Sequence, residues 1–114
     1  MSDNTLENWQ TQVRKGLLEL CVLNALRDGR QYGYDIVKQL RMLDGVVIGE
    51  GTIYPILSRF RNQGLVETTI EESPDGPPRK YYRLTTQGRK AVTQMNESWD
   101  KIDQAVRALR REET

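Results

Sequence analysis

The sequence GEGTIYPILSRFRNQGLVETTIEESPDGPPRKYYRLT, at residues 49–85, decides the fold of this 114-residue chain. Its first third predicts a short helix that buries one apolar face, because large apolar residues recur there at helical spacing. Gly64 predicts the end of that helix, since glycine readily adopts the left-handed conformation of a helix stop. Two strands follow, at about 65–71 and 79–84, and the sequence SPDGPP at 73–78 predicts the turn between them. The apolar face of the helix comprises Ile53, Ile56, Leu57 and Phe60.

Helices are also predicted on both sides of this stretch. A largely apolar run predicts a buried helix within residues 5–28, and an amphipathic pattern predicts a second helix at 33–42. The short link at 44–49 predicts a strand-like turn. A last helix, at about 85–111, begins with two threonines, which are good N-cap residues. The order of three helices, a hairpin and a helix is that of a winged helix-turn-helix, so the fold class is α+β, mainly α.

The final helix carries a second strong signal, which is a narrow apolar seam. Its large apolar residues are spaced by alternating steps of three and four, as in a coiled-coil heptad. A helix that packs only on its own domain usually shows a wider apolar stripe. We therefore predict a winged helix-turn-helix unit at 1–84 and a dimerisation helix at 85–114, packed as one compact unit. The predicted homodimer interface comprises Val92, Met95, Trp99, Ile102, Val106 and Leu109.

Composition limits the classes to which this protein can belong. The chain is 37% hydrophobic and 29% charged, which predicts one soluble domain, and no apolar run approaches the ~20 residues that span a bilayer. One cysteine, and no signal-peptide pattern at the start, predict a reducing, cytoplasmic location without a membrane partner. Histidine is absent, so the most versatile acid/base group and the commonest metal ligand are missing. We therefore predict no enzyme activity, no metal site and no cofactor.

The charge of the chain is segregated locally, although its net charge is only +1. Cations gather in the short helix and the return strand, whereas the outgoing strand and the turn are acidic. A donor-rich helix followed by a basic hairpin favours double-stranded DNA, and a two-fold dimer favours an inverted-repeat operator. The alternative is a winged helix that contacts another protein and binds neither DNA nor a ligand. The candidate DNA contacts are Tyr34, Lys38, Thr52, Tyr54, Ser58, Arg59, Asn62, Arg79 and Lys80.

Three segments resemble PadR-type transcriptional regulators. GTIYP at 51–55, followed by Arg59, resembles the recognition helix of that family, and YGYDI at 32–36 resembles its second helix. GPPRKYYRLTTQG at 76–88 resembles its wing and the entry to its C-terminal helix. The resemblance covers about residues 13–110 and implies the short branch, with a single C-terminal helix. It implies a dimeric bacterial repressor of detoxification or drug-efflux genes, released from its operator by a small molecule.

The seam also carries the candidate ligand site. ESW at 97–99, followed by Asp103, resembles the multidrug-sensing short members, in which paired tryptophans sandwich flat aromatic compounds. The alternative is that Trp99 only packs in the dimer core. Two further alternatives stay open: Cys21 is a small core residue or a redox-sensing thiol, and Tyr54 is a core residue or a phosphate contact. The candidate ligand contacts are Trp9, Val13, Leu20, Trp99 and Asp103.

Overall fold

The computed structural model describes residues 3–43 and 50–111, and it confirms a mainly helical chain with one small sheet. The strand-like turn expected at 44–49 lies outside the described residues. The sheet is antiparallel, with strand order β1-β3-β2. Its elements, in chain order, are α1 (Asp3–Ala25), β1 (Gln31–Tyr32), α2 (Gly33–Arg41), α3 (Glu50–Asn62), β2 (Val66–Ser73), β3 (Gly76–Leu84) and α4 (Thr86–Arg110).

One apolar core joins the helices to the base of the sheet. The core takes side chains from α1, α2, α3, the inner ends of β2 and β3, and the start of α4. The apolar face predicted for α3 is buried, which confirms that prediction. It also fixes which side of α3 is left for solvent. The side chains that are shielded from solvent most completely are Leu23, Leu26, Ile36, Leu40, Ile53, Leu57, Val22, Val37 and Val92.

The helix stop and the hairpin follow the sequence pattern, with one difference at the tip. Gly64 has φ 78°, the left-handed conformation expected at a helix end. The predicted turn at 73–78 is too long, because β2 continues to Ser73 and β3 begins at Gly76. Pro77 and Pro78 are tolerated in β3 because β1 pairs only with Tyr81 and Tyr82, which leaves the outer part of β3 open on that side.

The last helix begins and ends as expected, but its first turns belong to the core. The Thr85 side chain caps α4 by accepting a hydrogen bond from the Gly88 backbone N–H at 3.0 Å. Val92 is only 2% exposed, so its assignment to the dimer interface is wrong: its own core covers it within one chain. Met95 also packs partly against this core. The exposed part of the seam therefore begins at Trp99.

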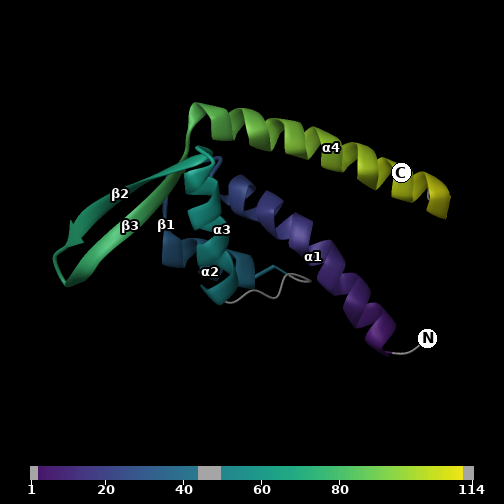
Figure 1. Cartoon of the computed structure of the whole chain (residues 1–114), viewed down its shortest axis with the longest axis horizontal. Helices are drawn as coiled ribbons and strands as arrows, with labels where there is room; N and C mark the ends of the chain where they lie inside the picture. The colour runs from purple at the N-terminus through teal and green to yellow at the C-terminus, as the bar shows by residue number, and fades with distance from the viewer. Residues whose placement is uncertain (1–2, 44–49, 112–114) are drawn as a thin grey trace.

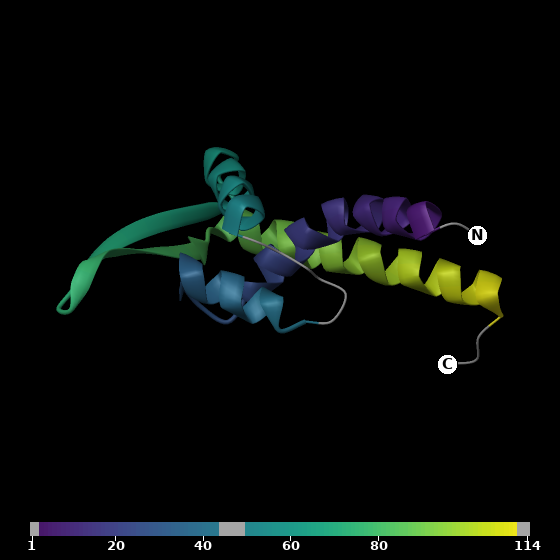
Figure 2. The ribbon, with the colours of Figure 1, turned by 90° about the horizontal axis from the view of Figure 1, so that it is seen from below.

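The molecule is elongated, measuring 54 × 32 × 25 Å along its principal axes. The hairpin of β2 and β3, which we call the wing, projects from one end (Figure 1). At the opposite end, α1 and α4 run toward the two chain termini and diverge, and we call these outer halves the arms (Figures 1 and 2). Within residues 3–43 and 50–111, no helix combines the length and apolar character needed to cross a membrane.

Candidate functional site

The first candidate surface is the side of α3 that faces away from the core. Ile53 and Leu57 are fully buried and hold α3 against the other helices. Ser58 and Asn62 are exposed, and their spacing of four residues places them one above the other on the opposite side. Thr52 is exposed as well. Three of the predicted DNA contacts therefore present hydroxyl or amide groups to solvent, which are groups that bond to base edges and phosphates.

Tyr54 lies on the flank of α3 and links it to α2. Its side chain is half-buried and packs against the core, which favours a mainly structural role for this predicted DNA contact. Gly33 makes the approach of α2 feasible, since a Cβ there would lie 2.9 Å from Tyr54 Cε1 and 3.1 Å from Tyr82 Cε1. The start of α2 is thereby held beside α3. Tyr34 and Lys38 are exposed on α2, with the Lys38 Nζ 5.7 Å from the Tyr34 ring centroid.

Arg59 occupies the flank of α3 that faces α1. Its guanidinium forms an ion pair with Glu19 of α1, and both side chains are partly exposed. The predicted contact Arg59 is therefore engaged within the chain, away from Ser58 and Asn62 at the centre of the outward face. Sequence reasoning missed Glu19, because the two partners are 40 residues apart and no local pattern connects them.

The two cations predicted at the wing, Arg79 and Lys80, point to opposite faces of the sheet. Successive side chains of a strand alternate, and Tyr82 marks the face that packs on the core, so Lys80 shares that face. Arg79 lies on the other face, with its Cζ 5.1 Å from the Tyr32 ring centroid. Among the described residues, the Lys80 ammonium has no ion pair or ring partner. Lys80 is therefore the better placed of the two for a phosphate.

Two carboxylates of β2 each pair with an arginine. Arg83 Nε lies 2.5 Å from a Glu67 carboxylate oxygen across the strand pair. Arg30, which precedes β1, forms an ion pair with Glu71 and lies 4.3 Å from the Tyr81 ring centroid. Its guanidinium lowers the pKa of the Glu71 carboxyl, and Glu71 raises the pKa of Arg30 in turn. Arg30 was missed because it lies 41 residues from Glu71.

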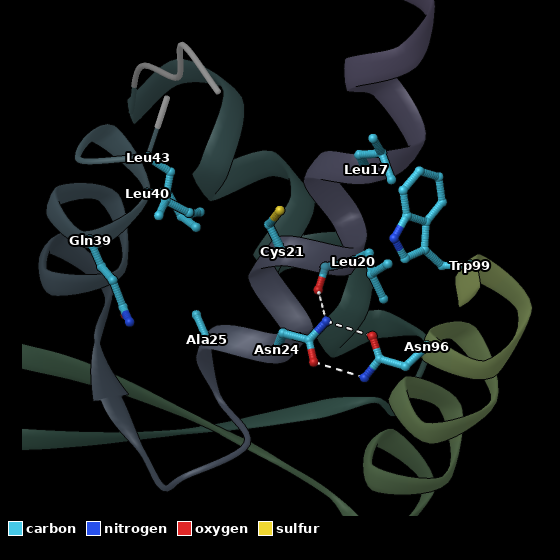
Figure 3. Close-up of a pocket in the computed structure, with 10 residues that line it drawn as sticks. All are labelled: Leu17, Leu20, Cys21, Asn24, Ala25, Gln39, Leu40, Leu43, Asn96 and Trp99. Carbon is cyan, nitrogen blue, oxygen red and sulfur yellow. Dashed lines mark hydrogen bonds between the residues drawn. The ribbon is translucent and has the colours of Figure 1, made fainter. Parts of the chain in front are cut away.

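A second candidate site is a cavity of about 480 Å³ between α1, α2 and α4 (Figure 3), which we call the cleft. Leu20 and Cys21 line it from α1, Leu40 from α2 and Trp99 from α4. Cys21 packs against the core, and burial raises the pKa of its thiol, which favours the core role over the redox-sensing role.

An amide pair that sequence reasoning missed joins α1 to α4 at the cleft. Asn24 Nδ2 donates to Asn96 Oδ1, and Asn96 Nδ2 donates back to Asn24 Oδ1, each at 2.9 Å. Asn24 Nδ2 also donates to the Leu20 carbonyl at 3.0 Å. The two asparagines are 72 residues apart, so no sequence pattern connects them.

The predicted ligand contacts are only partly brought together. Val13, Leu20 and Trp99 line a neighbouring cavity of about 420 Å³ between α1 and α4. Trp9 and Asp103 line neither this cavity nor the cleft. Trp9 is 62% exposed on the diverging arm of α1, and Asp103 forms an ion pair with Arg107 at 3.2 Å on α4.

The chain resembles several known proteins along most of its length. The model of the transcriptional regulator PadR-like family matches residues 22–94. A PadR family transcriptional regulator from Eggerthella lenta is 31% identical, with 97% of this chain and 96% of that chain covered and a TM-score of 0.83. A PadR-like transcriptional regulator from Bacillus cereus is 34% identical, with 90% and 99% covered and a TM-score of 0.79. Bacillus subtilis PadR, in a complex with operator DNA, is 25% identical, with 69% of this chain and 45% of that chain covered and a TM-score of 0.64.

Proposed function

Since the family model matches more than half of its residues, the chain belongs to the PadR-like family of transcriptional regulators, and we propose that it is a homodimeric repressor that binds operator DNA. The family comprises transcriptional regulators, which are not enzymes. The single observation that carries the proposal is the exposed polar face of α3, with Ser58 and Asn62 at its centre, beside a wing that carries Lys80. The operator complex of Bacillus subtilis PadR supports DNA as the partner.

The arms support the dimer. Trp99, Ile102 and Val106 are exposed along one seam of α4, and Leu6 and Trp9 are exposed on α1. An apolar stripe of this length is typical of a helix that packs against a second helix. A two-fold dimer through the arms presents two copies of α3 to the same duplex, which favours an inverted-repeat operator.

The third part of the proposal is regulation by a small aromatic molecule bound near Trp99. The apolar cavity of about 420 Å³ that Val13, Leu20 and Trp99 line supports it, since ligand sites are usually concave and mostly apolar. Detoxification or drug-efflux genes are the proposed targets, and a repressor of such genes acts in the cytoplasm.

The test is fluorescence anisotropy of labelled DNA taken from upstream of the gene, with a scrambled sequence of the same length as the reference. Sequence-selective binding that weakens steeply with salt is expected, with a slope of about −0.9 for each phosphate contact in a plot of log K against log salt. Lys80→Ala should flatten that slope by about 0.9 or more per protomer.

Lys101→Ala is the matched control, because it removes the same charge from an exposed position in the outer half of α4, and this half of the helix lies away from the wing (Figure 1). Binding of genomic fragments that nowhere exceeds binding of scrambled DNA would overturn the proposal in favour of a protein-interaction module. Equal slopes for the two variants would remove Lys80 from the interface.

A further inference from the structure

The cleft is lined without a single charged side chain among the described residues, although 29% of the chain is charged. Its apolar walls comprise Leu17 and Leu20 on α1, Leu40 on α2 and Leu43, which follows α2. An ion that entered these walls would lose its hydration without gaining a partner of opposite charge, which is strongly unfavourable. The lining therefore selects against both anions and cations.

Two polar side chains of the cleft, Asn24 and Asn96, are held in a fixed orientation. The Leu20 carbonyl can only accept, so it requires Asn24 to present its Nδ2, and this in turn fixes Asn96. Both N–H groups of Asn24 are engaged, whereas Asn96 uses one of its two. Each amide oxygen accepts one bond and can accept a second. The pair therefore retains one donor and two acceptor positions, without rotation of either side chain.

A further donor lies across the cleft from this pair. The Trp99 indole projects from α4 over Leu17 and Leu20, with its nitrogen directed toward α1 (Figure 3). No group in the described part of the chain accepts a hydrogen bond from that nitrogen. The cavity of about 480 Å³ falls within the range of about 300–1,000 Å³ that is usual for small-molecule sites.

From this combination we propose that the cleft binds a small uncharged molecule with an apolar body and one hydrogen-bonding group, which the Asn24–Asn96 pair recognises. This site lies within one protomer and reaches α2, unlike the set predicted around Trp99 and Asp103. Ligand binding in the cleft does not depend on the proposed function, whereas any effect of the ligand on DNA binding rests on it. A ligand that bonds to the open positions of the amide pair contacts the junction of α1 and α4 directly, and α1 also carries Glu19, the partner of Arg59 on α3.

The test compares two dyes that share one ring system and differ in charge. N-phenyl-1-naphthylamine is neutral, apolar and carries one N–H group, whereas 8-anilinonaphthalene-1-sulfonate adds a sulfonate to the same rings. Binding to the full-length protein is followed by dye fluorescence, and by Trp99 emission in a Trp9→Phe background, where Trp99 is the remaining tryptophan. The neutral dye should bind at least about tenfold more tightly, because the cleft offers no cation to the sulfonate.

Two variants assign the dye to the cleft. Asn24→Leu/Asn96→Leu replaces both amides with apolar side chains of similar size and should weaken binding of the neutral dye by about fivefold or more. Leu43→Arg places a cation on the wall of the cleft just after α2 and should reverse the preference toward the sulfonate. Met42→Arg is the matched control, because Met42 is the neighbouring exposed residue and does not line the cleft.

The outcomes separate this proposal from the proposed function, because DNA binding is measured on the same protein samples. Equal affinity for both dyes overturns the proposal, and so do a neutral dye that does not bind and a Leu43→Arg variant that behaves like Met42→Arg. In those cases, sequence-selective DNA binding that is still intact would support the proposed function independently of the cleft. Loss of sequence-selective DNA binding with normal dye binding overturns the proposed function alone. Circular dichroism of each variant checks folding, and Leu43→Arg provides the test if the double variant does not fold.

Discussion

The two ends of the molecule differ in whether their exposed side chains find partners within the same chain. At the wing, cations and carboxylates are paired within the chain, as Arg30 is with Glu71 and Arg83 is with Glu67. At the arms, apolar side chains project without a covering surface, and Leu109 is 85% exposed. Four charged groups at the wing are therefore paired within the chain, with Lys80 as an exception, whereas the apolar side chains of the arms have no cover within the described residues.

This difference indicates which parts of the structure would depend on the second copy in the proposed homodimer. Charges that are paired within one chain keep their geometry whether the protein is a monomer or a dimer. Exposed apolar stripes of this size are unfavourable in water and are typical of interfaces. We therefore expect substitutions at the arms to change assembly, and substitutions at the wing and α3 to change DNA binding with the assembly intact.

The largest effect is expected at the arms. Ile102→Asp/Val106→Asp places two carboxylates in the proposed interface and should raise the dimer dissociation constant by at least about 100-fold, since an unpaired charge in an apolar interface costs several kcal/mol. Gln104→Asp is the control, because it adds a carboxylate on the opposite side of α4. Analytical ultracentrifugation measures both. A double variant that remains as dimeric as the control contradicts the assignment of the seam.

The second effect contrasts the core of the DNA-binding end with its surface. Leu57→Ala removes a fully buried side chain of α3 and should lower the free energy of unfolding by about 2–5 kcal/mol. Ile70→Ala, at a position of the wing that is 68% exposed, should change it by less than about 0.5 kcal/mol. Urea unfolding at fixed protein concentration measures both values. Similar losses would mean that another surface covers Ile70.

The third effect concerns the role of Arg59. Arg59→Ala should lower operator affinity by about 1–3 kcal/mol if the guanidinium exchanges Glu19 for a phosphate or a base. Glu19→Gln should then leave the affinity unchanged or raise it, because an exposed ion pair is worth only about 0–1 kcal/mol and the arginine becomes free. Anisotropy titrations compare the two variants. Equal losses in both would show that Arg59 positions α3 against α1 and does not contact DNA.

The smallest effect is expected on the pKa of Glu71, in strand β2 of the wing. The folded-state pKa of Glu71 is lowered by Arg30, so the stabilisation is present above the ordinary glutamate value of 4.5 and is lost as the pH falls through the folded-state pKa. NMR titration of the Glu71 carboxyl should give a pKa below 4.5, and Arg30→Ala should return it toward that value. A Glu71 pKa that is the same in the variant as in the wild type would show that the ion pair with Arg30 does not lower it.

Local patterns predicted most of the fold. Apolar spacing located the buried face of α3, Gly64 marked its end, and the threonines located the start of α4. The wing turn was predicted too long, because two prolines suggest a loop whereas an open strand edge accepts them. The two-residue strand β1 was not predicted, since it exists only through its pairing with β3.

Fewer features of the candidate site could be predicted from the sequence. Exposure of Thr52, Ser58 and Asn62 follows from helical periodicity once the buried face of α3 is known. The partners Glu19, Arg30 and Asn96 pair over long sequence separations, so no local pattern identifies them. Val92 was assigned to the interface because the heptad spacing does not show that the first turns of α4 are covered by the core of the same chain.

The most direct test measures the salt dependence of DNA binding for the wild-type protein and for Ile102→Asp/Val106→Asp on the same upstream DNA. If α3 and the wing bind DNA while the arms only join two copies, the variant should bind more weakly, with about half of the wild-type slope, because one protomer makes half of the phosphate contacts. An equal slope and an equal affinity for the two proteins would contradict the account, because the arms would then have no part in presenting two DNA-binding ends to one duplex.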